Sequence, residues 1–196
     1  MHNENFLIIQ QEMEWLDSLL NEAFGLNFDR SGLGSVYQKP VLDLPEIEAS
    51  DIPNMVYARF ILNNQLTFED RLLLALAMLM HWQPDALERF RRIGSSVKAI
   101  TDSLIKSASF DYWLPSGLTY VYLYAGQDKA KRYQIVHYLH TQSPLIAHGV
   151  VSIGGHLPGE PALSGVLSIS PVYWQLLTEN HPNLDLLNLE TTETHA

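Results

Sequence analysis

The sequence predicts a mainly α-helical protein with one small β-hairpin near its C-terminus. Apolar side chains recur at helical spacing in several stretches, and the run Leu72–Met80 is apolar on every face of a helix. Two β-branched runs, at 149–153 and 165–169, are joined by a loop rich in glycine and proline. This arrangement indicates a hairpin with a long tip, because glycine and proline cannot continue a strand ladder.

These patterns divide the chain into three stretches. Residues 1–108 form a helical region, residues 109–178 contain the hairpin, and residues 179–196 form an acidic tail that we expect to be partly disordered. The first stretch includes a region at about 27–53 with glycines, prolines and little periodicity. We interpret it as a long connecting segment.

The first predicted helix covers residues 6–24. Its apolar residues repeat at helical spacing, and acidic residues, Glu12 and Glu14 among them, lie between them. The helix is therefore expected to be amphipathic, with one acidic side that faces solvent. Gly25 is a stop signal for a helix.

Three further helices are predicted before residue 108. One runs from Asn54 to about Gln65, and the next begins after Thr67, which has the side chain of an N-cap. The apolar run at 72–80 predicts that this helix is the buried axis of the helical region. Pro84 then suits the first turn of a helix over 85–92.

The C-terminal stretch has the element order of a known motif. Ser116 is a cap for one helix that ends at Gly126, and Asp128 opens a second helix that runs to about Thr141. The hairpin follows, and a short last helix extends to Leu177. Helix, tight turn, helix and hairpin is the order of a winged helix, so we predict a winged-helix-like region at 109–178.

Composition limits the function classes. The chain of 196 residues contains no cysteine, which excludes disulfides and thiolate metal sites. A net charge of −10 argues against nucleic acid as the main ligand, because phosphate contacts need clustered lysine and arginine. The longest apolar run is about half of a membrane span, and the acidic start does not resemble a secretory signal. We expect a soluble cytoplasmic protein without membrane contact.

Catalytic motifs are missing from the sequence. There is no phosphate-binding loop of the Gly-x-x-x-x-Gly-Lys type, no Gly-x-Ser-x-Gly elbow and no His-Glu-x-x-His motif. His137 and His140 have a spacing that can bind a metal, but no acid stands at ligand spacing beside them. We therefore predict no catalytic residue, no metal site, no cofactor and no enzymatic activity.

Five residues are the candidates for partner binding. Lys129, Lys131 and Arg132 lie in the first turn of the second helix, where winged helices that bind DNA contact the duplex. His156 and Glu160 lie in the hairpin tip. A DNA-binding tip is normally basic, whereas this tip has an acid and no lysine or arginine. Protein docking is therefore the preferred function of this surface.

Three segments resemble a known family. They are Phe-Glu-Asp-Arg-Leu-Leu-Leu-Ala-Leu-Ala at 68–77, Trp-Leu-Pro-Ser-Gly-Leu-Thr-Tyr-Val-Tyr-Leu-Tyr-Ala-Gly at 113–126 and Pro-Ala-Leu-Ser-Gly-Val-Leu-Ser-Ile-Ser at 161–170. Together they resemble the N-terminal region of bacterial AAA-family ATPases of the type found in Bacteroidetes and beside contractile injection systems. In the family pattern, threonine stands in place of Ser116 and glutamate in place of Leu118.

The resemblance implies a docking function without ATP hydrolysis, because the phosphate-binding loop and arginine-bearing lid of the family are missing. The chain would be a stand-alone homologue of that domain or a piece of a longer ATPase. Its partner would be a protein, such as an AAA-family ATPase or an injection-system component. Two alternatives stay open: a winged-helix DNA-binding regulator, and a structural component of a contractile-injection-type particle that self-associates through the helix at 6–24.

Overall fold

The computed structural model describes residues 4–23, 44–47, 55–91, 102–178 and 187–189. The fold is mainly helical with small antiparallel hairpins, which confirms the predicted class. The helices are α1 (Glu4–Ala23), α2 (Val56–Asn63), α3 (Phe68–Trp82), α4 (Glu88–Arg91), α6 (Gly117–Ala125), α7 (Lys129–Thr141), α8 (Pro144–Ala147) and α9 (Pro171–Thr178). The strands are β1 (Ile105–Lys106), β2 (Trp113–Leu114), β3 (Val151–Ile153) and β4 (Leu167–Ile169).

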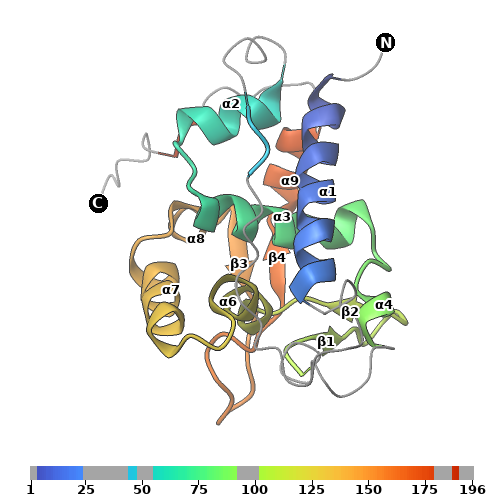
Figure 1. The fold of residues 1–196 in the computed structure, drawn as a ribbon, viewed down its shortest axis with the longest axis vertical. Coiled ribbons are helices and arrows are strands. Elements are labelled where there is room, and N and C mark those ends of the chain that lie inside the picture. Colours follow the sequence, from blue (N-terminus) through green and yellow to red (C-terminus); the bar gives the residue numbers. More distant parts are fainter. Residues whose placement is uncertain (1–3, 24–43, 48–54, 92–101, 179–186, 190–196) are drawn as a thin grey trace, which may run out of the picture.

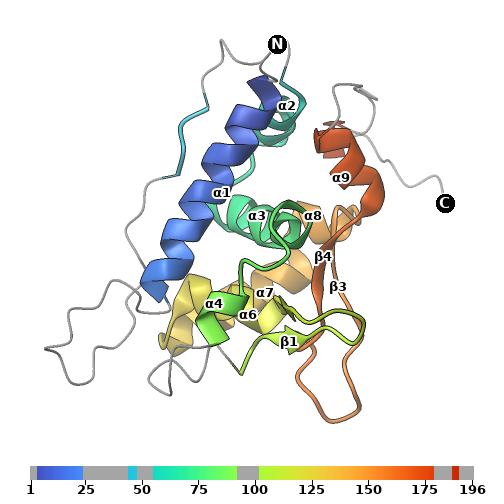
Figure 2. The ribbon, with the colours of Figure 1, turned by 90° about the vertical axis from the view of Figure 1, so that its right-hand side faces the viewer.

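Helix α3 is the central element of the fold, as the all-apolar run predicts. It lies between α1 and the α6–α7 pair in both views (Figures 1 and 2). Every residue from Asp70 to Leu79 is buried. Because α3 packs on α1, α6, β3 and β4, one cluster of buried apolar side chains extends through both of the predicted stretches on either side of residue 108.

Helix α1 contributes its whole apolar stripe to this core. The buried apolar side chains are Ile8, Ile9, Met13, Trp15, Leu16, Leu19, Leu20 and Ala23. Glu12, however, does not lie on a solvated side: it is fully buried and forms an ion pair with Arg71 of α3. The expectation that Glu12 faces solvent is therefore wrong, because a buried arginine 59 residues away provides its counter-charge.

Two asparagine side chains connect segments that are far apart in the sequence. Asn5 on α1 is buried; its amide donates to the carbonyl of Leu177 at 2.7 Å and its oxygen accepts from the backbone of Tyr57 at 2.8 Å. Asn64, after α2, similarly bonds the backbone of residues 187–189. Leu187 and Leu189 are buried, so this part of the predicted tail packs on the helical region.

Capping residues define the helix ends as predicted. Thr67 and Asp70 form a reciprocal capping box at α3, and Ser116 and Thr119 form one at α6. Asp128 accepts bonds from the first turn of α7. Gly126 ends α6 with φ at +55°, a conformation that favours glycine.

The predicted hairpin is formed by β3 and β4 in antiparallel register, with Ser152 opposite Ser168. A bridge from Ser116 to Val166 adds the residue before α6 to the same sheet edge. The sequence did not indicate the second hairpin, β1–β2, or helix α8. The strands have two residues each and α8 has four, which is too short for a periodic pattern.

Parts of the predictions lie outside the described residues. These are most of the connecting segment at 27–53, the helix stop signal at Gly25, the end of the predicted helix at Arg92 and most of the acidic tail. Within the described part of the chain, no helix combines the length and the apolar character needed to cross a membrane.

Candidate functional site

Helix α7 is set in place by the turn that precedes it. The turn needs only Gln127 and Asp128 between Gly126 and α7, and Asp128 Oδ1 accepts from the backbone of Ala130 at 2.9 Å and Lys131 at 3.1 Å. This cap satisfies two amide groups that the first turn of a helix leaves without partners. The direction of α7 relative to α6 is thereby fixed.

The inner side of α7 is anchored on α6 and α3. Ile135 and Leu139 are its buried residues. The hydroxyl of Tyr138 donates to Oδ1 of Asp70, the carboxylate of the α3 capping box. Burial and the bond to Asp70 raise the pKa of Tyr138, and burial raises the pKa of Asp70 as well. The contact therefore lies in a partly desolvated position, and this desolvation disfavours the charged form of each group.

Tyrosines of α6 bind the first turn of α3 in the same way. The hydroxyl of Tyr124 donates to Oε1 of Glu69 at 2.8 Å, and that of Tyr120 donates to the Glu69 carbonyl at 3.1 Å. Burial, with the neighbouring Glu69 carboxylate, raises the pKa of Tyr124 to about 12. Most tyrosines of this region thus serve the core rather than a partner.

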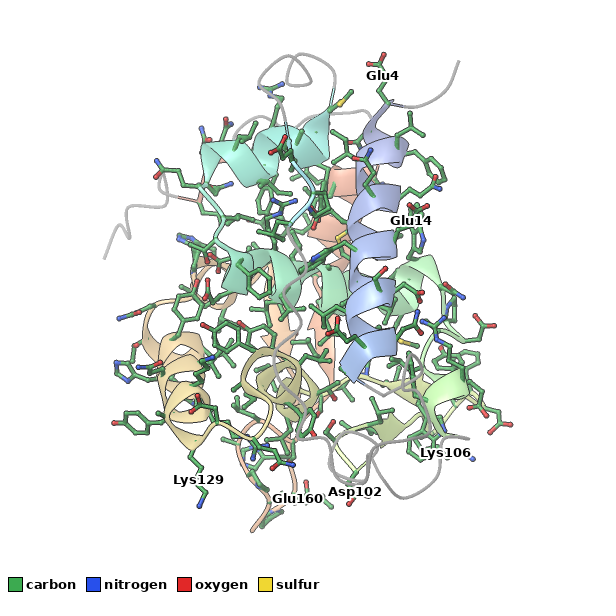
Figure 3. The ribbon with its side chains drawn as sticks, in the orientation of Figure 1. Glu4, Glu14, Asp102, Lys106, Lys129 and Glu160 are labelled. Atoms are coloured by element: carbon green, nitrogen blue, oxygen red, sulfur yellow. The ribbon has the colours of Figure 1, made fainter. Side chains whose placement is uncertain are left out.

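The outer side of α7 is free of the core and rich in polar groups. Its exposed residues include Lys129, Lys131, Tyr133, His137 and His140. Tyr133 is 77% exposed, the largest value among the large hydrophobic residues of the described chain. Lys129 extends away from the molecule at its lower end (Figure 3).

Arg132 differs from its two basic neighbours. Its Nε donates to the carbonyl of Gly126 at 2.6 Å, and its guanidinium lies 5.5 Å from the ring centroid of Tyr122. The side chain therefore holds the α6–α7 turn. Of the three predicted basic residues, Lys129 and Lys131 are exposed and Arg132 is half-buried.

His156 and Glu160 lie in the β3–β4 loop, and both are exposed. The bonds of Glu160 stay within that loop: Oε2 accepts from the backbone of Leu157 and from the hydroxyl of Ser164, each at 3.1 Å. Thus the five candidate residues come from two separate elements, with Glu160 acting as an organiser of its own loop.

Tyr133 is an aromatic residue of α7 that the sequence analysis does not single out, and the structure exposes it. The signal was present in the spacing. Ile135 and Leu139 are four apart and share one face, whereas residue 133 stands two positions from Ile135, about 200° around the helix. An aromatic residue on the face opposite the core is a candidate for contact with a partner.

His137 and His140, whose spacing could bind a metal, do not belong to a cluster of metal-ligating side chains in the described residues. No group of three or more His, Cys, Asp or Glu side chains lies close enough there to hold a metal ion.

The buried ion pair between Glu12 and Arg71 is a further pair of charged groups in the described residues. Arg71 also donates to the carbonyl of Pro45 at 2.8 Å, and burial raises the pKa of Glu12. Its position inside the core favours a structural role.

Comparison with family models, curated proteins and solved structures finds no significant match to this chain. The proposed docking surface therefore rests on the arrangement of the side chains.

Proposed function

We propose that this chain is a non-enzymatic protein-docking domain that binds its partner through the outer face of α7. The observation that supports the proposal best is the exposure of Tyr133 on a helix of 13 residues that buries only two of them, Ile135 and Leu139. A helix held at its inner side and open along its outer side is a ready contact surface.

The side chains of this face suit a protein partner. Lys129, Tyr133 and His137 stand four residues apart, so they form one stripe about 12 Å long on the helix. Tyrosine provides a large contact area at low cost in conformational entropy, and flanking polar groups give orientation. The order α6, turn, α7, the short helix α8 and the β3–β4 hairpin supports a winged-helix-like interpretation, in which α7 is the helix that contacts the partner.

The resemblance to the N-terminal region of AAA-family ATPases suggests the class of partner. We propose an AAA-family ATPase or a component of an injection-type assembly, in a cytoplasmic setting. The chain would supply recognition, and the partner would supply any ATP hydrolysis. This part of the proposal depends on the three resembling segments.

DNA binding is the second candidate, and Lys129 and Lys131 in the first turn of α7 favour it. The net charge of −10 and a hairpin loop that has Glu160 but no lysine or arginine oppose it. We expect no duplex binding by fluorescence anisotropy at low salt. Binding that weakens steeply with added salt would replace the docking proposal by the DNA-binding one.

The docking surface can be tested by affinity capture from the cells that produce the protein. Variants Lys129→Glu and Tyr133→Ala should lose the proteins that the unchanged chain retains. Lys106→Glu is the matched control, because Lys106 is also an exposed lysine, 53% accessible, and lies on β1, away from α7 (Figure 3). Equal recovery with Lys129→Glu, Tyr133→Ala and Lys106→Glu would contradict the proposed surface.

A further inference from the structure

A second feature lies away from the outer face of α7, between the two hairpins. A cavity of about 370 Å³ is bounded by the segment before β1, by the start of α6 and by the β3–β4 loop. Its walls include the apolar side chains of Ile105, Leu118, Leu157 and Val166. Leu157 is 68% exposed, so an apolar surface is left open to solvent at this site.

Two carboxylates line the same cavity, Asp102 before β1 and Glu160 in the β3–β4 loop. Figure 3 shows both at the lower end of the molecule. The bonds that Glu160 accepts within its loop both use Oε2, so Oε1 remains available among the described contacts. Lys106 is the basic residue of β1, and its Nζ lies 3.1 Å from Oδ1 of Asp111. Its charge is therefore paired with Asp111, not with Asp102 or Glu160.

Two serines that line the cavity are hydrogen-bonded to each other. They are Ser116 and Ser103, and the buried hydroxyl of Ser116 donates to the carbonyl of Ser103 at 2.6 Å. The base of the loop is closed by contact between two glycine backbones: a Cβ on Gly165 would lie 1.8 Å from the carbonyl oxygen of Gly154. These contacts hold the start of α6 and the base of the β3–β4 loop in place. Asp102 and Glu160 are the charged residues among those described that line the cavity.

We propose that this cavity receives the side chain of a lysine or arginine from a protein partner. Such a side chain has an aliphatic stem and a cationic end. The stem would pack on Leu118 and Leu157, and the cation would lie between Asp102 and Glu160, where a charge-assisted hydrogen bond can form with each. An anionic or purely apolar ligand would leave one of these two features without a partner.

The inference goes beyond docking through α7 and does not depend on it, because the cavity is lined by residues of other elements. Loss of partner capture in α7 variants would leave this site untouched. Conversely, failure of the cation site would leave the outer face of α7 as the proposed surface.

The test is an NMR titration of the full chain labelled with ¹⁵N. The probes are the N-acetyl methylamides of lysine and arginine, and the N-acetyl methylamide of norleucine is the matched neutral control. We expect saturable shifts at the amides of Ile105, Leu118 and Leu157 with the two cationic probes. Norleucine should give weaker shifts that do not saturate.

Variants Asp102→Asn and Glu160→Gln should each weaken the cationic probes by roughly fivefold, the order expected for a partly exposed ion pair. Asp111→Asn removes an exposed carboxylate outside the cavity and should leave binding unchanged. The spectra also report whether each variant is folded. Absence of saturable shifts, equal shifts with norleucine, or unchanged affinity in both cavity variants would overturn the proposal.

Discussion

Removal of the guanidinium from the buried ion pair tests how α1 is held against α3. Glu12 is fully buried and Arg71 nearly so, with side-chain exposures of 0% and 8%. The variant Arg71→Met keeps most of the aliphatic stem and deletes the charge. Glu12 then stays inside the core with no opposite charge beside it, and its second oxygen, Oε2, already has no partner among the described contacts.

The expected loss is about 3–5 kcal/mol in the free energy of unfolding, the usual effect of breaking a buried pair from one side. A domain of this kind is stable by about 5–15 kcal/mol in total, so the variant should be near the limit of folding. The double variant Glu12→Leu/Arg71→Met should regain most of the loss, because neither charge is then buried.

The pH dependence of this loss has a defined sign. Burial already raises the pKa of Glu12 above its ordinary value of 4.5, and loss of Arg71 would raise that pKa further. A carboxyl group with a raised pKa in the folded state binds a proton more tightly there than in the unfolded chain. Stability is therefore lost as the pH rises through the folded-state pKa, and Arg71→Met should be most destabilised at neutral pH.

Urea unfolding followed by circular dichroism at pH 4.5 and pH 7 measures these quantities. Arg89→Met is the matched control, because Arg89 pairs with Asp17 of α1 at a site where both side chains are 37–40% exposed. That pair should contribute less than about 1 kcal/mol. If Arg71→Met costs no more than Arg89→Met, or if the double variant is no more stable than the single one, the reasoning is refuted.

Three further predictions concern the α6–hairpin region and α3. Gly165→Ala should destabilise the fold by about 3 kcal/mol because its Cβ would meet the Gly154 carbonyl, whereas Gly155→Ala, with no atom within 4 Å of its Cβ, should change stability by less than about 0.5 kcal/mol; equal urea midpoints would contradict this. Ser116→Ala should cost about 1–2 kcal/mol through loss of the α6 cap, and a thermal midpoint equal to that of the unchanged protein would speak against it. The pKa of Asp70 is raised above 3.8, so its contribution to stability should decline as the pH rises through that folded-state pKa; Asp70→Asn should flatten this slope in urea titrations, and parallel slopes would exclude the effect.

The local part of this structure could be predicted from the sequence. Caps such as Thr67, Ser116 and Asp128 act within three residues, and the apolar run of α3 fits only a buried helix, so these features follow from neighbouring residues. Glu12 could not be placed correctly, because its partner Arg71 is distant in the sequence and acidic residues at that spacing usually face solvent.

The candidate sites divide in the same way. The basic first turn of α7 was readable from the sequence. The exposure of Tyr133 was missed, although the helical spacing from Ile135 and Leu139 places residue 133 on the opposite face. The cavity between the hairpins could not be foreseen. Asp102 and Glu160 line the same cavity because a two-residue strand pair, too short for any periodic signal, lies beside the β3–β4 loop.

Asp70 and Arg71 are consecutive residues of α3, yet they bind different helices. Asp70 accepts the hydroxyl of Tyr138 from α7, and Arg71 pairs with Glu12 from α1. One turn of α3 therefore contacts both the proposed docking helix and the N-terminal helix. The position of the proposed docking helix and that of the N-terminal helix therefore depend on neighbouring side chains of the same turn.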